Sequence, residues 1–232
     1  MVVDSNQAAE RWLLYSGNYQ PALTFILQQH SPPGGYCLDI GANLGFYTIK
    51  FGQWVGGTGY VAAFEANAAM VERIQDNVAL NGFSQVTVVS AAVHSQPGQV
   101  EFFVSSDPGK SSVNQIDKAT KKIVVPAIVI DEYVSEHHLP RLDVIKMDIE
   151  GNDCNALLGA VNTLTHFRPF LVFEYKNTTP PETADRAFSL LADLDYQLYS
   201  LSRNGEQLRF DWKTSRLTQT DIICIPADRK GR

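Results

Sequence analysis

Short apolar runs recur along the chain, and each is bounded by turn residues and followed by a segment with apolar positions at helical spacing. Parallel strands that are buried on both faces have such continuous apolar runs, and helices connect them in βα units. The predicted strands are Tyr36–Ile40, Gly59–Glu65, Val86–Val93, Asp143–Asp148 and Phe170–Glu174. The predicted helices are Leu44–Trp54, Ala68–Leu80 and Asn152–Leu164. The pattern therefore predicts an α/β fold with a doubly wound sheet.

One region in the middle of the chain departs from this βα rhythm. Val100–Val104 and Ile123–Ile130 have the composition of extended segments, and they flank a polar loop, Ser105–Lys122. A polar loop on a rigid scaffold is a candidate lid or substrate wall, or else a connection with no ligand role.

The C-terminal region also departs from it. Asn-Gly at Asn204-Gly205 is a strong hairpin signal, and it lies between the apolar segments Tyr196–Ser202 and Gln207–Trp212. Thr220–Ile225 then supplies a last strand. We therefore expect the sheet to end in antiparallel pairing.

The clearest break in the chain is Ser31–Gly35, which contains two prolines and two glycines. It separates an N-terminal helical segment, Gln7–Gln29, from the first predicted strand. We expect a division into residues 1–35 and one α/β domain over residues 36–232. The N-terminal segment is either a cap over the site or an ordinary packed helix.

Composition narrows the class of protein. The chain has 232 residues, 44% of them hydrophobic, which is enough to bury a substantial core. Its formal net charge of −6 lacks the basic excess typical of nucleic-acid binding. The three cysteines are far apart and form no CxxC pair, and we find neither a signal peptide nor a membrane-spanning apolar run. We therefore expect a cytoplasmic protein that binds neither nucleic acid nor membrane.

A glycine turn follows the first predicted strand, in the sequence Asp39-Ile40-Gly41-Ala42-Asn43-Leu44-Gly45. A dinucleotide fingerprint, GxGxxG, would need glycines where this chain has Asn43 and Phe46. An acid at the end of the strand repels a phosphate and attracts a cation. The turn therefore favours a ligand with a positive centre over a pyrophosphate.

A second acid, Glu65, lies at the end of the next predicted strand. In a doubly wound sheet both acids, Asp39 and Glu65, emerge at the carboxyl edge where ligands bind. Glu65 can accept both hydroxyls of a ribose. A ligand with a ribose, a positive centre and no phosphate suits this pair, and S-adenosylmethionine has all three properties.

At this point the sequence resembles the FkbM-like S-adenosylmethionine-dependent methyltransferases over Tyr36–Tyr175. The motifs that carry the resemblance occur in the family's order, and they are DIGANLGFY from Asp39, FEAN from Phe64, Asn81-Gly82, SAAV from Ser90, KMDIEG from Lys146 and VFE from Val172. The resemblance implies a Rossmann-like class I methyltransferase fold, a mostly parallel seven-stranded sheet with an antiparallel last strand. It also implies that residues 36–232 are the methyltransferase domain, and that the reaction is O-methylation of a hydroxyl on a small molecule, sugar or glycan.

The resemblance assigns cofactor-binding residues by motif position. Glu65 would bind the ribose, and the methionine end would be lined by Asp39, Gly41, Asn43 and Gly45. Two departures from the family pattern concern the same ligand. Ala66 replaces a common proline, and Ser90-Ala91-Ala92 has no carboxylate for the adenine amino group. Binding of the adenine would then depend on backbone groups and on apolar packing. Ala92 is the candidate residue for this contact.

Candidate catalytic residues lie at two later strand ends. Period-two alternation places Lys146 and Asp148 on one side of their strand, so Asp148 is the first candidate for a base or an acceptor-orienting group. The alternative is a structural ion pair beneath the site, with Glu150 as a helix cap. Glu150, in the loop after Asp148, is a second candidate catalytic residue, and Asp148 is also a candidate contact to the cofactor. Glu174 is a candidate acceptor-site residue, and His94, after the third strand, is a weaker candidate base.

Asp148, Glu150 and Glu174 could together hold magnesium, whose preferred ligands are oxygens. Metal dependence is not expected, and no residue is assigned as a metal ligand.

Two alternatives to methyl transfer remain open. Glu65 would also suit a nicotinamide-dependent oxidoreductase, although the missing glycines argue against it. A cofactor-binding partner protein without catalysis would carry the same motifs. The GKS sequence at Gly109-Lys110-Ser111 lacks the first glycine of a P-loop, so ATP binding is not expected. The acceptor, the position of methylation and the oligomeric state are not specified.

Overall fold

The computed structural model describes residues 1–2, 15, 17, 19–105, 111–114, 119–202, 205–215 and 219–229. The large sheet contains eight strands in the order β10-β9-β11-β8-β7-β1-β2-β3 within these residues. Its strands are β1 Tyr36–Ile40, β2 Tyr60–Glu65, β3 Val86–Ser90, β7 Val144–Met147, β8 Phe170–Lys176, β9 Tyr196–Leu201, β10 Gln207–Arg209 and β11 Gln219–Pro226. A smaller sheet has the order β4-β6-β5, with β4 Ala92–Val93, β5 Gly98–Ser105 and β6 Ala119–Ile128.

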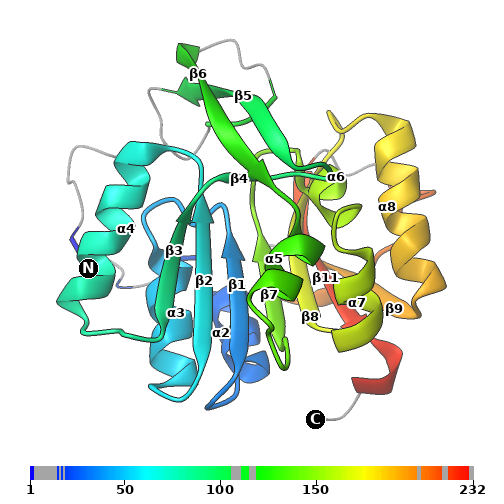
Figure 1. Ribbon diagram of the computed structural model, residues 1–232. Coiled ribbons are helices and arrows are strands. Elements are labelled where there is room, and N and C mark those ends of the chain that lie inside the picture. The colour runs from blue at the N-terminus through cyan, green and yellow to red at the C-terminus, as the bar shows by residue number, and fades with distance from the viewer. Residues whose placement is uncertain are drawn as a thin grey trace.

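Helices cover both faces of the large sheet. One face packs against α2 Pro21–His30, α3 Phe46–Val55 and α4 Ala68–Leu80. The other face packs against α5 Ile130–Glu136, α6 Asp153–Leu157, α7 Val161–Phe167 and α8 Pro181–Asp193. In Figure 1 α2 lies behind the sheet and α5 and α7 lie in front of it. A short 3-10 turn, η2 Ala227–Arg229, follows the last strand.

The pairing confirms the doubly wound topology. β3, β2, β1, β7 and β8 are parallel neighbours, and β11 runs antiparallel between β8 and β9. These seven strands form the sheet expected from the resemblance. β10 pairs with β9 through Gln207↔Leu201 and adds an eighth strand at the edge, so the hairpin pairing is confirmed. Arg203 and Asn204 of its turn lie outside the described residues.

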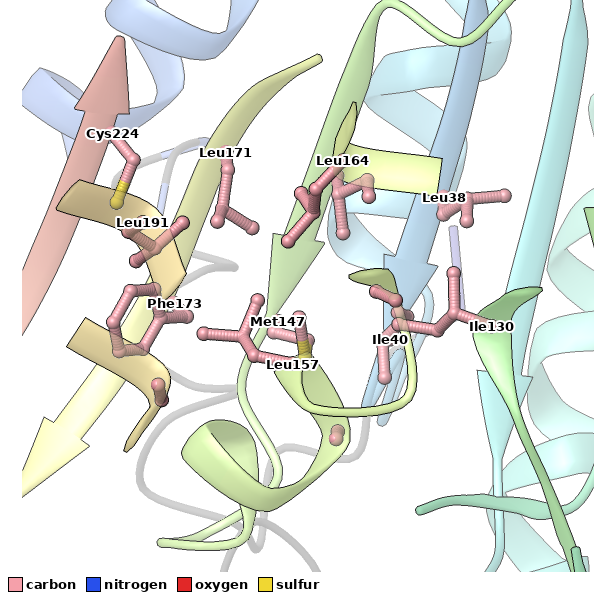
Figure 2. Packing of buried hydrophobic residues seen from close by; sticks show 14 of the residues in the cluster. Leu38, Ile40, Ile130, Met147, Leu157, Leu164, Leu171, Phe173, Leu191 and Cys224 are labelled. Carbon is pink, nitrogen blue, oxygen red and sulfur yellow. The ribbon is translucent and has the colours of Figure 1, made fainter. Parts of the chain in front are cut away.

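The larger part of the core lies on the face covered by α5 to α8. Alternate strand residues point into it, and Figure 2 shows them packed against residues of the helices. The fully buried members in that view are Leu38, Ile40, Ile130, Met147, Leu157, Leu164, Leu171, Phe173, Leu191 and Cys224. The intervening strand residues, among them Cys37, Val144, Val172 and Ile223, pack against α2 and α3. This strict alternation fixes which residues face which side of the sheet.

Two predicted elements are each divided in the structure. The strand predicted over Val86–Val93 ends at Ser90, because Ser90 already pairs with the last residue of β2, Glu65. Ala92 and Val93 pair instead with β6 in the smaller sheet. The helix predicted over Asn152–Leu164 is interrupted at Gly159, where a Cβ would lie 2.8 Å from the His94 carbonyl oxygen.

Other boundaries also differ from the prediction. The segment Ile123–Ile130 is strand only to Ile128, and α5 begins at Ile130. Two helices, α5 and α8, were not predicted. Helix α8 has a proline at its first position and buries Ala184, Ala187, Phe188 and Leu191 at helical spacing, so its signal was present in the sequence. The second C-terminal segment is strand only over Gln207–Arg209.

The N-terminal helix and the central polar loop are described only in part. Within the predicted segment Gln7–Gln29, the described helix is α2, which begins at Pro21. Most of the loop Ser105–Lys122, including Lys110, lies outside the described residues. The segments that flank this loop pair as the antiparallel strands β5 and β6. Figure 1 shows this smaller sheet beyond the edge at which the parallel strands of the large sheet end.

Candidate active site

Charged side chains gather at the carboxyl edge of the large sheet, on the face covered by α2 and α3. Three of these residues each lie two positions after an apolar residue that packs on that face. The pairs are Cys37 and Asp39, Val144 and Lys146, and Val172 and Glu174. Asp221 is the register partner of Glu174 in the antiparallel pair β11–β8. Because side chains alternate along a strand, these groups share one face and one edge.

The glycine turn after β1 is fixed by backbone contacts. The N–H groups of Gly41 and Ala42 both donate to the Phe64 carbonyl oxygen, at 2.9 and 3.0 Å. Gly41 has a φ of +75°, and a Cβ there would lie 2.0 Å from the Asp148 carbonyl oxygen. Only glycine permits this conformation together with this close approach. The turn therefore lies directly against the chain at the end of β7.

Glu65 at the end of β2 holds the same turn. Its Oε2 accepts from the Asn43 N–H at 2.9 Å, and its Oε1 accepts from the Asn67 N–H at 2.8 Å. Burial raises the pKa of this carboxyl group, and the backbone donors oppose the shift. A carboxylate has about four acceptor positions, so two remain for ligand hydroxyls.

Lys146 lies between two carboxylates. Its Nζ is 3.8 Å from Asp39 Oδ1 and 3.8 Å from Asp148 Oδ2, and 5.2 Å from the centre of the Tyr47 ring. Asp39 is fully buried, and its Oδ2 accepts from Thr48 Oγ1 at 2.6 Å. Burial lowers the pKa of Lys146, but Asp148 and Asp39 outweigh it, so the pKa is raised and the ammonium is kept.

A second lysine, Lys176, holds the outer carboxylates. It donates to Glu150 Oε2 and lies 3.0 Å from Glu174 Oε2, while Gln219 donates to Glu174 Oε1. Oxygens of Asp148, Glu150 and Glu174 lie within 4.8 Å of one another, a spacing at which a metal ion could bind. The Lys176 ammonium already provides positive charge at two of the three. The structure therefore shows an ion-pair network at the position considered for magnesium.

Three further residues belong to this edge and were not singled out from the sequence. Asp221 is mostly buried, and burial followed by Asp148 and Glu174 raises its pKa to about 6, against Lys146. Tyr19, before α2, packs edge-on against Tyr47 at 6.4 Å between ring centres, and its pKa is raised by burial and then by the charge of Asp148. Asp153, fully buried, accepts from the N–H groups of Ile149 and Gly151, both at 3.3 Å, and so holds the loop that carries Glu150.

Of these three, only Asp153 carries a sequence signal, because an acid in the first turn after a glycine is a helix-start feature. Residues 111–114, between β5 and β6, contact the same loop. Ser112 Oγ and Asn114 Nδ2 donate to the Glu150 carbonyl oxygen at 3.2 and 3.3 Å.

His94 and Ala92 lie on the β4 side of the site. The His94 Nδ1 accepts from the Gln96 N–H at 3.3 Å, and burial lowers the pKa of His94. Ala92 is buried and packs with Ala66, the residue after Glu65, and with Phe102 and Val125. Ala92 therefore forms part of an apolar wall beside Glu65.

Unfilled hydrogen-bond positions at this edge test whether S-adenosylmethionine fits. In the described part of the chain, Asp39 Oδ1 and Asn43 Oδ1 are buried and accept no hydrogen bond. Glu174 Oε2 accepts none either, although Lys176 is close to it. Buried acceptors without donors favour a ligand rich in N–H and O–H groups. The amino group of the cofactor fits Asp39 Oδ1, which lacks a donor.

Comparison with known families gives the decisive observation. The methyltransferase FkbM domain matches residues 39–198, which is more than half of the chain and includes the glycine turn, Glu65 and the carboxylates of β7 and β8. The chain belongs to the FkbM methyltransferase family. Membership confirms the expected family, the class I fold and the cofactor, S-adenosylmethionine. It also favours methyl transfer over the nicotinamide-dependent alternative.

Relatives of this FkbM family member are distant. Hexuronic acid methyltransferase AglP of Haloferax volcanii is 24% identical over 170 residues, which cover 72% of this chain and 66% of AglP. A solved FkbM methyltransferase of Methylobacillus flagellatus has a TM-score of 0.56 at 18% identity, over 82% of this chain and 43% of that chain. This protein thus spans slightly less than two thirds of the first relative and less than half of the second.

The likeness in fold extends beyond the family. Fibrillarin of Aeropyrum pernix, solved with S-adenosyl-L-methionine bound, has a TM-score of 0.50 at 11% identity, over 88% of this chain and 74% of that chain. At this identity the likeness concerns the fold alone. In the part of the chain that is described, no helix has the length and apolar character needed to cross a membrane.

Proposed function

We propose that this protein transfers the methyl group of S-adenosylmethionine to a hydroxyl of a sugar or of a related small molecule. The observation that carries the proposal is the position of three carboxylates, Asp148, Glu174 and Asp221, beside Asp39 on one face of the sheet. Carboxylates accept hydrogen bonds from hydroxyl groups, and an adjacent row of them suits an acceptor with several hydroxyls. AglP, a distant relative, is a hexuronic acid methyltransferase, which supports a sugar acceptor.

Glu65 would hold the ribose, and the methionine end would lie along Asp39, Gly41, Asn43 and Gly45. The cofactor, when bound, supplies a methyl group on a sulfonium, an activated leaving group. Asn43 and Asp39 present the acceptors without donors described above. Ala92 and Ala66 provide apolar surface beside Glu65 for the adenine.

Asp148 is the proposed base. Its side chain is 34% exposed, more than the 23% of Glu150 or the 11% of Glu174, so it is the most accessible of the three carboxylates to an acceptor. The Lys146 ammonium lies 3.8 Å from its Oδ2. A carboxylate in this position would accept a hydrogen bond from the acceptor hydroxyl and take up its proton, while the methyl–oxygen bond forms and the methyl–sulfur bond breaks to leave the thioether. Glu150 and Glu174, held by Lys176, would orient the acceptor, and His94 has no assigned step.

The test is methyl transfer from labelled S-adenosylmethionine to methyl glucoside and to methyl glucuronoside. The glucuronoside offers both hydroxyls and a carboxylate, so its product is treated with mild alkali, which cleaves a methyl ester and leaves a methyl ether. We expect an alkali-stable ether. The Asp148→Asn variant should lose about 100-fold or more of the rate. Label that is released by alkali, or a variant as active as the wild type, would overturn the proposal.

A further inference from the structure

Lys146 occupies an unusual position, because it is the buried cation common to both ends of the site. Its residue is only 5% exposed, and it is the register partner of Asp39 in the parallel pair β1–β7. Asp39 belongs to the turn proposed for the methionine end, and Asp148 is the proposed base for the acceptor. The ammonium lies 3.8 Å from each.

Neither contact has the length of a made hydrogen bond. Charge-assisted N–H···O bonds are about 2.7–2.9 Å long, and Asp39 Oδ1 accepts no hydrogen bond at all. Thr48 serves the other oxygen of Asp39, so Oδ1 is the position left open. The Lys146 ammonium thus lies equally far from both carboxylates and beyond hydrogen-bonding distance of either. Lys146 is therefore shared between two partners and committed to neither.

A ligand ammonium would change this balance. The amino group of the cofactor would supply Asp39 Oδ1 with the donor that it lacks, and Lys146 would then be released toward Asp148. We propose that Lys146 is a positioning residue that links the cofactor end to the acceptor end: occupation of Asp39 by a ligand ammonium pairs Lys146 with Asp148. The inference rests on the proposed placement of the methionine end at Asp39.

Linkage makes this coupling reciprocal. If pairing of Lys146 with Asp148 favours an ammonium at Asp39, then loss of the Asp148 charge leaves Lys146 to Asp39 alone. Lys146 then competes with the ligand ammonium for the same carboxylate. Removal of Asp148 should therefore weaken ligands that carry the ammonium and spare ligands that lack it.

The experiment is calorimetric titration with two probes. S-adenosylhomocysteine carries the amino group, whereas 5′-methylthioadenosine keeps the adenosine and the sulfur and lacks the amino acid end. We compare wild type, Asp148→Asn, Lys146→Met and the double variant. Lys146→Arg keeps the charge. Glu101→Gln, which removes a carboxylate 2.5 Å from Lys122 on the smaller sheet, is the matched control.

We expect Asp148→Asn to raise the Kd of S-adenosylhomocysteine about fivefold, and to leave that of methylthioadenosine within about twofold. In the Lys146→Met background the same change should alter either Kd by less than about twofold. Lys146→Arg should keep the difference, and Glu101→Gln should change neither Kd.

Equal effects of Asp148→Asn on both probes would overturn the inference, and this arm needs no variant at the buried lysine. An effect of Asp148→Asn that is the same with and without Lys146 would overturn it as well. Failure of the proposed sugar O-methylation is a separate result, because these affinities are measured without an acceptor.

Discussion

At the end of β1 and β2 backbone groups fix the site, whereas at the end of β7, β8 and β11 charged side chains hold one another. The first region contains Gly41 in contact with the Asp148 carbonyl and Glu65 bonded to two N–H groups. The second contains Lys146 and Lys176, each shared between two carboxylates. Backbone contacts suit a ligand that is the same in every member of a family. Side-chain contacts can be altered by substitution without a change in the backbone. The difference agrees with a common cofactor and a variable acceptor.

The largest effect should come from disrupting the backbone contacts at the end of β1 and β2. Gly41→Ala places a methyl group 2.0 Å from the Asp148 carbonyl oxygen at a φ of +75°. We expect a loss of about 3 kcal/mol or more in the free energy of unfolding, and no measurable binding of S-adenosylhomocysteine. Denaturant unfolding and calorimetry measure the two effects.

Gly82→Ala is the matched control, because Gly82, just after α4, has a φ of +66° with no atom within 4 Å of the added Cβ. It should cost only about 1–2 kcal/mol and leave binding intact. Equal effects of the two substitutions would mean that the contact between the turn and β7 contributes nothing.

Next in size is the loss of Glu65. Glu65→Ala removes the carboxylate proposed for the ribose and releases the N–H groups of Asn43 and Asn67. We expect the Kd of S-adenosylhomocysteine to rise at least about 30-fold. Methylthioadenosine, which keeps the ribose, should be weakened as much. Glu72→Ala on the exposed side of α4 should have no effect, and an unaltered Kd in Glu65→Ala would remove the ribose assignment.

The charged side chains at the end of β7, β8 and β11 should affect how stability depends on pH. Asp221 has a pKa near 6 in the folded protein, raised first by burial, against 3.8 for the free group. The folded state thus binds the proton more tightly than the unfolded state. Between about pH 4 and pH 6 the contribution of Asp221 to the stability of the wild type should therefore fall as the pH rises, by on the order of 2 kcal/mol.

Asp221→Asn should remove this loss, so the variant should gain stability relative to the wild type from pH 4 to pH 7. Urea unfolding at several pH values measures the difference. If the difference in free energy of unfolding between the variant and the wild type stayed constant over this range, the pKa of Asp221 would not be raised. Asp221 would then not interact with Asp148 and Glu174 as described.

The smallest effect should come from metal removal. Lys176 already pairs with Glu150 and Glu174, so a divalent ion is not needed to balance these carboxylates. Treatment with a chelator should change the rate of methyl transfer by less than about twofold. Loss of activity that magnesium restores would instead place an ion among Asp148, Glu150 and Glu174.

The site residues at the end of β1 and β2 were predicted well from the sequence because they lie in two short segments. The acid, the glycines and Asn43 occupy one turn, and Glu65 ends the next strand, so strand periodicity alone brings them to one edge. Most strands of the large sheet were predicted within one or two residues for the same reason. The main errors arose where a partner outside the segment decided, as when β6 took Ala92 and Val93 from the end of β3.

The charged residues at the end of β7, β8 and β11 were predicted only in part because they come from separate segments. Asp148, Glu150 and Glu174 follow parallel strands and were found from that rule. Asp221 lies near the start of an antiparallel strand, which reaches the same edge only because β11 runs backwards beside β8. Tyr19 comes from before the first strand, and only the folded chain packs it against Tyr47, whose ring lies 5.2 Å from Lys146.

A crystal structure of the protein with S-adenosylhomocysteine would show whether one sheet face holds the cofactor at β1–β2 and leaves β7, β8 and β11 for the acceptor. We expect the ribose hydroxyls on the Glu65 carboxylate, the amino group on Asp39 Oδ1 and Lys146 closer to Asp148 than its present 3.8 Å. A ligand whose ribose lies away from Glu65, or whose amino acid end occupies the positions of Glu174 and Asp221, would contradict this expectation.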